Sequence, residues 1–169
     1  MPKRRILAID PGTRYMGYAL LEGGKPVYYG VKVIKTRDRF PHERLKEARA
    51  VILALIQDFR PRILAIEKTF FSNNRNVALL NVLFEEIKAI GRRKGLKVIS
   101  LAPSTIKRNV CGNGRARKWE VAKVVVAKHP ELKIFLHQNR KWKERYWQNM
   151  FDAVALGMVV EKIVAKEKT

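Results

Sequence analysis

The sequence predicts an α/β fold with a five-stranded mixed sheet and helices on both faces. Three strand-like segments come first, and a helix, strand, helix, strand pattern follows them. Two of the strands carry almost the same apolar hexapeptide, RILAID at 5–10 and RILAIE at 62–67, which is typical of strands covered on both faces. The 169 residues are 47% apolar, enough for a sizeable core, and we expect residues 1–169 to form a single domain.

The first three strands are expected to form an antiparallel meander. A nearly continuous apolar run at 4–10 ends at a Pro-Gly pair, and residues 15–21 resume as a second strand. A Gly-Gly pair then predicts a tight hairpin into the alternating segment 27–35. This order places the first strand beside the second.

Helices and strands alternate in the rest of the chain. Apolar residues recur at helical spacing from Pro41 to Phe59, and again from Val77 to Ile90. Gly95 is a plausible end of the second helix, and residues 96–101 follow as the fifth strand. Beyond Pro103 the pattern is helical, with a short helix first and then helices at about 116–128 and 146–166.

The repeated hexapeptide has a structural explanation. The helix between its two copies is a crossover connection, so the first and fourth strands are expected to lie parallel and adjacent, with the fifth parallel to them. Asp10 and Glu67, the last residues of the two copies, would then lie side by side at the carboxyl edge of the sheet, where ligand sites of α/β folds occur.

Two adjacent carboxylates repel each other, and a shared proton, a basic partner or a divalent cation relieves the repulsion. Asp152 at the start of the last helix could join Asp10 and Glu67, and Asn149 lies on the same helix face three residues earlier. Such oxygen ligands favour Mg²⁺, with Mn²⁺ as a substitute, and two such ions support phosphodiester hydrolysis. In the alternative, Asp10 caps a turn, Glu67 pairs with a lysine, and Asp152 is exposed near a helix N-terminus.

The charge of the chain indicates a polyanionic partner. There are 36 Lys and Arg against 15 Asp and Glu, a net charge of +21. Nucleic acid is the leading candidate and an anionic membrane surface the second; a thermophile's surface would carry more Glu. No apolar run approaches the roughly 18 residues of a spanning helix, so no membrane segment is expected. Cys111 is the only cysteine, which favours the cytoplasm and excludes an internal disulfide.

Four motifs in this order resemble the RuvC family of Holliday-junction resolvases, within the RNase H-like superfamily. They are IDPGTRYMGYAL, AIEKTFFSNNRNVA, APSTIKRNVCGNGRARK and FDAVALGMVV. The resemblance implies an RNase H-like fold and a divalent-metal-dependent endonuclease, active as a homodimer, that nicks two strands of a four-way DNA junction symmetrically in recombination and repair. It also implies that a branch-migration complex is a possible partner.

The resemblance also assigns residues. Asp10, Glu67 and Asp152 match the metal-binding carboxylates, and Asn149 stands where the family usually has Asp or His, which would weaken one metal site. Lys118 is expected to offset charge in the transition state. Phe70 matches an aromatic near the branch point, and Lys107 and Lys118 match basic residues near the cleaved strand.

Residue types also predict further DNA contacts, independently of the family resemblance. The loop after Glu67 carries two aromatics, one of which is expected to stack on an unpaired base, and polar or basic neighbours. The segment KRNVCGNGRARK combines five basic residues with two glycines that allow close approach to phosphates. The candidates are Phe70, Phe71, Asn73, Asn74, Arg75, Lys107, Arg108, Arg115, Arg117 and Lys118. The basic segment 139–145, which includes Trp142, is a further candidate contact that the family pattern does not explain.

Two other classes of function stay open. The DPGT turn and hairpin also resemble the phosphate-binding turn of actin-like ATPases, although such chains typically have two domains. A non-catalytic binder of branched DNA or structured RNA is the second alternative, and Asn149 is the main argument for it.

Overall fold

A five-stranded sheet forms the centre of the molecule, and the computed structural model describes residues 2–35, 41–69 and 75–168, except for the side chains at 75 and 76. The sheet order is β3-β2-β1-β4-β5. Strands β1 to β3 pair antiparallel, whereas β4 is parallel to β1 and β5 to β4. The strands are β1 (Arg5–Asp10), β2 (Tyr15–Glu22), β3 (Lys25–Val33), β4 (Ile63–Glu67) and β5 (Lys97–Leu101). This topology confirms the predicted mixed sheet.

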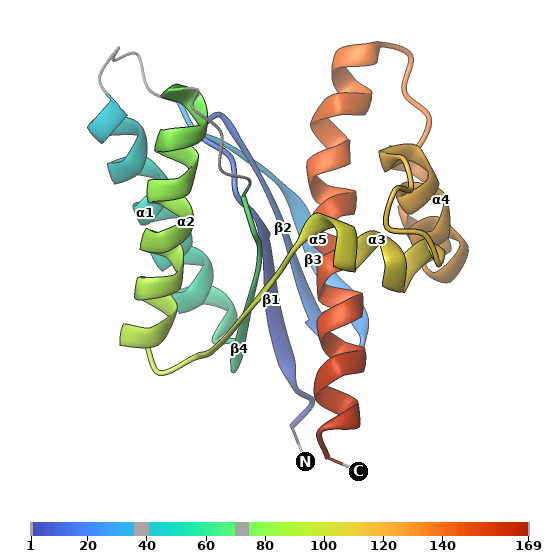
Figure 1. Ribbon diagram of the computed structural model, residues 1–169, viewed down its shortest axis with the longest axis horizontal. Coiled ribbons are helices and arrows are strands. Elements are labelled where there is room, and N and C mark those ends of the chain that lie inside the picture. The colour runs from blue at the N-terminus through green and yellow to red at the C-terminus, as the bar shows by residue number, and fades with distance from the viewer. Residues whose placement is uncertain (1, 36–40, 70–74, 169) are drawn as a thin grey trace.

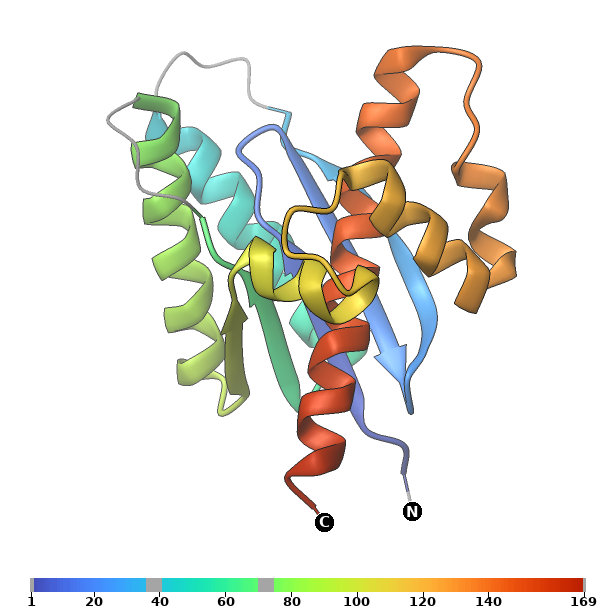
Figure 2. The same ribbon diagram turned by 45° about the vertical axis from the view of Figure 1, so that its right-hand side comes forward.

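Helices cover both faces of the sheet (Figure 1). Helices α1 (Pro41–Phe59) and α2 (Arg75–Arg93) lie on one face. The other face carries α5 (Lys141–Lys166), with α3 (Pro103–Cys111), α4 (Lys118–Lys128) and a short 3₁₀ helix (Pro130–Phe135) packed around it. Figure 2 shows α5 running along the sheet with α3 and α4 beside it. No helix in the described ranges is both long and apolar enough to cross a membrane.

The two hexapeptide copies pair with each other residue for residue. In the parallel β1–β4 ladder Ile6 is opposite Ile63, and the register continues to Ile9 opposite Ile66. Alternate side chains point to opposite faces, so Ile6 and Ala8 join the core under α5 while Leu7 and Ile9 join the core under α1 and α2. Because both faces are buried, the positions from Ile6 to Ile9 and from Ile63 to Ile66 are all apolar.

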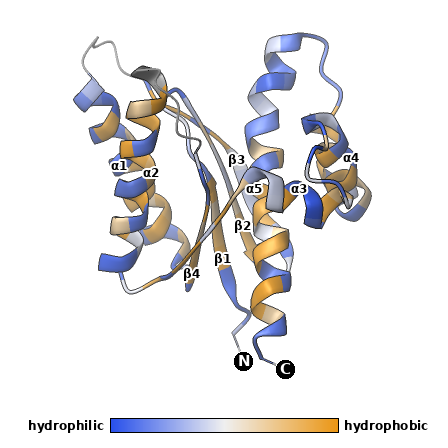
Figure 3. Cartoon of the chain, in the orientation of Figure 1, coloured by the Kyte–Doolittle hydropathy of each residue, from blue (hydrophilic) through white to orange (hydrophobic). Residues whose placement is uncertain are grey.

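Helix α5 begins five residues earlier than the apolar pattern predicted, at Lys141 rather than Tyr146. Its buried stretch runs from Met150 to Val160, and its first turn is solvated. Figure 3 shows this contrast, with a hydrophobic half against the sheet and a hydrophilic beginning. Apolar periodicity reports only the buried part of a helix, whereas Lys, Glu and Arg form helix well without any apolar signal.

Other boundaries differ by a few residues. Helix α4 begins at Lys118 rather than at about Ala116, and β3 spans 25–33 rather than 27–35. The 3₁₀ helix at Pro130–Phe135 was not predicted, because a single short element has no apolar repeat long enough to detect. None of these shifts changes the strand order.

Candidate active site

Asp10 and Glu67 are neighbours at the carboxyl ends of β1 and β4. The parallel register pairs Ile9 with Ile66, so the next residue of each strand is a carboxylate. Their side chains share a hydrogen bond. The sequence-based prediction that these two carboxylates meet is therefore confirmed by the geometry.

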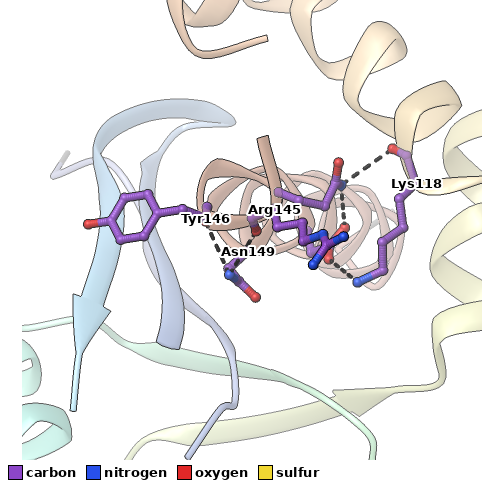
Figure 4. Close-up of polar contacts among 6 residues, drawn as sticks. Lys118, Arg145, Tyr146 and Asn149 are labelled. Atoms are coloured by element: carbon purple, nitrogen blue, oxygen red, sulfur yellow. Dashed lines mark hydrogen bonds and ion pairs between the residues drawn. The ribbon is translucent and has the colours of Figure 1, made fainter. Parts of the chain in front are cut away.

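Asp152 approaches the pair from α5, which crosses the strands. Its carboxylate is 15% exposed, and the Lys118 Nζ lies 3.4 Å from Oδ2. The Gln148 side chain donates from Nε2 to the other oxygen, Oδ1, at 3.0 Å and also to the backbone carbonyl of Lys118 at 3.3 Å. These contacts link the start of α4 to α5 (Figure 4).

One cleft of about 300 Å³, the catalytic pocket, brings the three carboxylates together. Its walls come from β1 and β4, the segments after them, and helices α2, α3, α4 and α5. Its polar and charged lining residues are Asp10, Glu67, Lys68, Thr69, Lys107, Lys118 and Asp152. Three acids and three lysines line this one cleft, a combination of charges suited to a cation and to an anion such as phosphate.

The electrostatics of the cleft follow from burial and mutual repulsion. Burial, and then the charges of Glu67 and Asp152, raise the pKa of Asp10 well above its usual value. Burial and the charge of Asp152 raise the pKa of Glu67 to about 7. Burial also raises the pKa of Asp152, although Lys118 and Gln148 oppose the rise. The Lys118 pKa is raised chiefly by Asp152, which keeps this lysine charged.

Protonation of one acid and the neighbouring Lys118 ammonium would both relieve the repulsion among these carboxylates. The hydrogen bond between the two side chains raises the pKa of Asp10 and lowers that of Glu67. Lys118 neutralises Asp152. Among the described residues no three acid, His or Cys side chains already converge as a metal-ligand group. The donor set nevertheless fits a hard divalent cation, because three carboxylates line one cleft and a cation relieves the same repulsion.

Asn149 occupies a different part of α5. Its Nδ2 donates to the backbone carbonyls of Arg145 and Tyr146 at 3.2 and 3.1 Å, and in Figure 4 the amide lies on the opposite side of the helix from Lys118. Within the described residues Asn149 is not part of the catalytic-pocket lining. Its backbone packs on Gly17, which pairs with Asp10 across the β1–β2 ladder, so it lies near Asp10 although it does not face Asp152.

Two polar residues that were not predicted from the sequence contact this region, Gln148 at Asp152 and Asn81 at Thr69. Gln148 orients Asp152 from one turn earlier on α5, an i,i+4 spacing that was visible in the sequence. The Thr69 hydroxyl donates to the side-chain oxygen of Asn81 on α2. No local pattern links Thr69 to Asn81, because the contact depends on where α2 packs.

The predicted DNA-contact residues fall into two groups. Lys107 lies in the catalytic pocket with Lys118, whereas Arg108, Arg115 and Arg117 are exposed around it. The Arg117 backbone N–H donates to Glu120 at 2.5 Å, which stabilises the start of α4. The remaining candidates lie outside the described residues. They are Phe70, Phe71, Asn73, Asn74 and the side chain of Arg75.

The glycines between α3 and α4 have a structural reason for being there. Gly112 has φ of 75° and caps the C-terminus of α3, where its N–H donates to the Arg108 carbonyl. A β-carbon at Gly114 would lie 3.3 Å from the Ser104 carbonyl oxygen. The turn thus explains both residues without a bound phosphate, and it directs the basic side chains outward.

Comparison with known proteins agrees with this geometry. The model of the family described as "Crossover junction endodeoxyribonuclease RuvC" matches residues 6–140. The RuvC of Pseudoalteromonas translucida is 37% identical over 123 residues, which cover 71% of each chain. The RuvC of Thermomicrobium roseum is 31% identical over 137 residues, which cover 72% of this chain and 76% of the relative.

Solved structures share the fold. The yeast mitochondrial Holliday junction resolvase Ydc2 superposes with a TM-score of 0.72 at 16% identity, covering 98% of this chain and 82% of that one. The Thermus thermophilus RuvC in complex with Holliday junction substrate has a TM-score of 0.70 at 20% identity, covering 92% and 90%.

The sheet order, the covering helices and the carboxylates at the strand ends define an RNase H-like nuclease fold. More specifically, the chain belongs to the RuvC family of crossover junction endodeoxyribonucleases, enzymes that cleave DNA at crossovers. The matched region ends at residue 140, so Asn149, Asp152 and most of the basic segment 139–145 lie beyond it.

Proposed function

We propose that this protein resolves four-way DNA junctions by nicking two strands, with Asp10, Glu67 and Asp152 as the ligands of divalent cations. The observation that carries the proposal is the register of β1 and β4, which ends two buried strands on adjacent carboxylates in a cleft shared with Asp152 and Lys118. A structural role for the pair is disfavoured, because burial of mutually repelling acids raises the pKa of each without adding stability.

Mg²⁺, with Mn²⁺ as a substitute, suits these ligands, and two ions bound there would supply a nucleophilic hydroxide and stabilise the leaving oxygen. The side chains of the protein would bind the phosphate and position the ligands. Lys118 and Lys107 place two positive charges on the rim, where they attract the scissile phosphate and offset its charge. Gln148 holds Asp152 in place through its hydrogen bond. Asn149 is the fourth proposed ligand, through its side-chain oxygen.

The substrate and the assembly are parts of the same proposal. The net charge of +21 supplies affinity for DNA of any sequence. Residues 1–169 are proposed to act as one nuclease domain that pairs as a homodimer, since two equivalent sites about a two-fold axis suit a two-fold junction. A branch-migration complex is the proposed partner, and the cytoplasm is the proposed location, where a lone Cys111 stays reduced.

The test is a nicking assay on a four-way junction, with linear duplex of equal length as the control. Symmetric nicks with Mg²⁺ or Mn²⁺, lost in Asp10→Asn, are the expected result. Tight binding of the junction without nicks at any metal concentration would favour the non-catalytic binder instead. Gel filtration combined with light scattering measures whether the active species is a dimer.

A further inference from the structure

A groove lies beside the catalytic pocket, between the start of α4 and the first turns of α5. We call it the α4–α5 groove, and it consists of two adjoining hollows of about 210 and 300 Å³. Its lining includes the aromatic and charged side chains of Lys118, Trp119, Lys123, Glu144 and Arg145. Lys118 also lines the catalytic pocket, so a strand whose phosphate lies at Lys118 has its next nucleotide within reach of the groove.

Trp119 is the central feature of the groove. It is 51% exposed, one position after Lys118, and it lines both hollows. The Lys123 ammonium lies 4.7 Å from the centroid of its ring. An indole half open to solvent adds little to the core. An aromatic ring beside a cation is the combination on which unpaired bases stack while their phosphates are neutralised.

The opposite wall belongs to α5. In Figure 4 the Arg145 side chain lies on the same side of the helix as Lys118, and Arg145, Lys118 and Lys123 place three positive charges along the groove. Glu144 is the one acidic residue among the described lining residues. A carboxylate repels phosphate but accepts a hydrogen bond from the amino group of a base. The charges therefore match a whole nucleotide better than a bare phosphate.

The wall formed by α5 is held firmly in place. The Tyr146 hydroxyl donates to the Val31 carbonyl of β3 at 3.2 Å. The Trp147 ring packs on Phe135 with centroids 4.4 Å apart, and Tyr146 packs edge-on against Tyr15 at 5.7 Å. Arg145 thus projects into the groove from a helix turn that is packed on two sides.

We propose that the α4–α5 groove holds an unpaired nucleotide of the strand that enters the catalytic pocket, with its base stacked on Trp119. The proposal rests on the proposed endonuclease function, and it adds a second site for DNA next to the chemistry. Paired bases of a duplex are already stacked on one another and leave Trp119 without a partner, whereas a base released at a branch point is free to stack. Residues 139–145 thus contact DNA through Arg145 and Glu144.

The first test measures binding in the Asp10→Asn background, in which the DNA stays intact. The probes are a four-way junction and a single-stranded oligodeoxycytidine of about eight nucleotides, a length typical of such grooves. Trp119→Ala is expected to weaken binding of the oligonucleotide about 5- to 100-fold, the effect of losing one stacked base, and Trp119→Phe is expected to retain most of the affinity. Unchanged affinity in Trp119→Ala would overturn the proposal.

Trp142→Ala is the matched control, because the proposal assigns the DNA contacts of residues 139–145 to Glu144 and Arg145 and leaves Trp142 outside them. Trp142 is also exposed, at 60%, and a lysine ammonium, that of Lys143, also lies 5.8 Å from its ring centroid. Among the described residues it is not part of the groove lining. Its loss is expected to change affinity less than about twofold. Equal losses in the two variants would mean that exposed tryptophans bind DNA in general, which contradicts a specific groove.

A spectroscopic test separates the groove from the proposed function. In Trp142→Phe protein the emission comes from Trp119 and Trp147, and stacking of a base on Trp119 is expected to quench it on titration with the oligonucleotide. Quenching in a protein that does not nick junctions would support the groove while the endonuclease proposal failed. The opposite outcome is a protein that nicks junctions but shows no quenching and binds equally well as Trp119→Ala. It would support the endonuclease function and overturn the groove alone.

Discussion

Gly17 on β2 lies directly beneath the backbone of Asn149 on α5. A β-carbon built at Gly17 would be 1.9 Å from the Asn149 carbonyl oxygen, far inside contact distance. Gly17 also pairs with Asp10 in the β1–β2 ladder. This close approach sets the height of α5 above the sheet at the level of the first carboxylate, and thereby the position of Asp152 one turn further along.

Gly17→Ala is expected to lift α5 and to lower both stability and cleavage. The clash involves backbone, which cannot rotate away, so we expect a loss of about 1–3 kcal/mol in the free energy of unfolding. Thermal or denaturant unfolding measures it. Gly24→Ala, in a turn with φ of 85° where the nearest atom is the Glu161 γ-carbon at 3.6 Å, tests backbone strain without the helix clash and should leave cleavage near its parental rate.

Asp10→Asn and Glu67→Gln are expected to reduce junction cleavage roughly 100-fold or more, beyond the 10- to 100-fold typical of residues that only support ligands. Binding to the junction is expected to persist, because distributed positive charge supplies the affinity. Single-turnover rates and gel-shift titrations measure the two effects separately. Either variant cutting at near the parental rate would show that the carboxylate assignment is wrong.

Gln148→Leu is expected to reduce cleavage about 10- to 100-fold with little change in junction affinity, because it removes the donor that orients Asp152. The loss should be partly recovered at higher Mg²⁺ concentration if Gln148 acts through the ligand. Gln138→Leu is the matched control, since among the described residues Gln138 donates to the Ile134 carbonyl, in an exposed segment away from the carboxylates. Similar losses in the two variants would argue against an orienting role.

Stability of the protein in a chelating buffer is expected to fall as pH rises from about 4.5 to 7. The pKa of Glu67 is 4.5 ordinarily and about 7 in the folded protein, so the folded state binds protons more tightly than the unfolded state across this window. Raising the pH therefore favours unfolding, by up to about 3 kcal/mol. Asp10→Asn removes part of the repulsion, so it should raise the melting temperature at pH 8 more than at pH 4. A melting temperature that rises between pH 5 and 8 would contradict this.

Asn149 is tested by titrating Mg²⁺ against cleavage rate. If its side-chain oxygen is a ligand, Asn149→Asp is expected to lower the Mg²⁺ concentration for half-maximal cleavage and Asn149→Ala to raise it, because an added negative charge strengthens cation binding. Superimposable curves for the three proteins would leave Asn149 with the role its contacts already have, as a hydrogen-bond donor to the Arg145 and Tyr146 carbonyls.

Phe70→Ala is expected to slow cleavage with little loss of thermal stability, as for a residue that stacks on DNA rather than packing in the core. Phe70 lies outside the described residues, so melting temperature and cleavage rate are measured together. A large drop in melting temperature with normal cleavage would assign Phe70 to the core and make Phe71 the stacking candidate.

Local sequence determined the sheet and its central carboxylates. Two buried parallel strands need apolar residues on both faces, so the repeated RILAI run was sufficient to predict that β1 and β4 are neighbours and that Asp10 and Glu67 meet. The strand order followed from the hairpin signal and the crossover helices. These features depend on periodicity and chain connectivity, which are properties of short segments.

Only the tertiary structure decided which polar side chains surround those carboxylates. Lys118 meets Asp152, and Gln148 rather than Asn149 orients it, because the rotation and height of α5 are set by packing on β2 and by the contact at Gly17. The groove at Trp119 likewise exists because the solvated start of α5, which has no apolar pattern, runs beside α4. Helix faces and contacts between distant segments depend on how whole surfaces pack, and no short stretch of sequence carries that information.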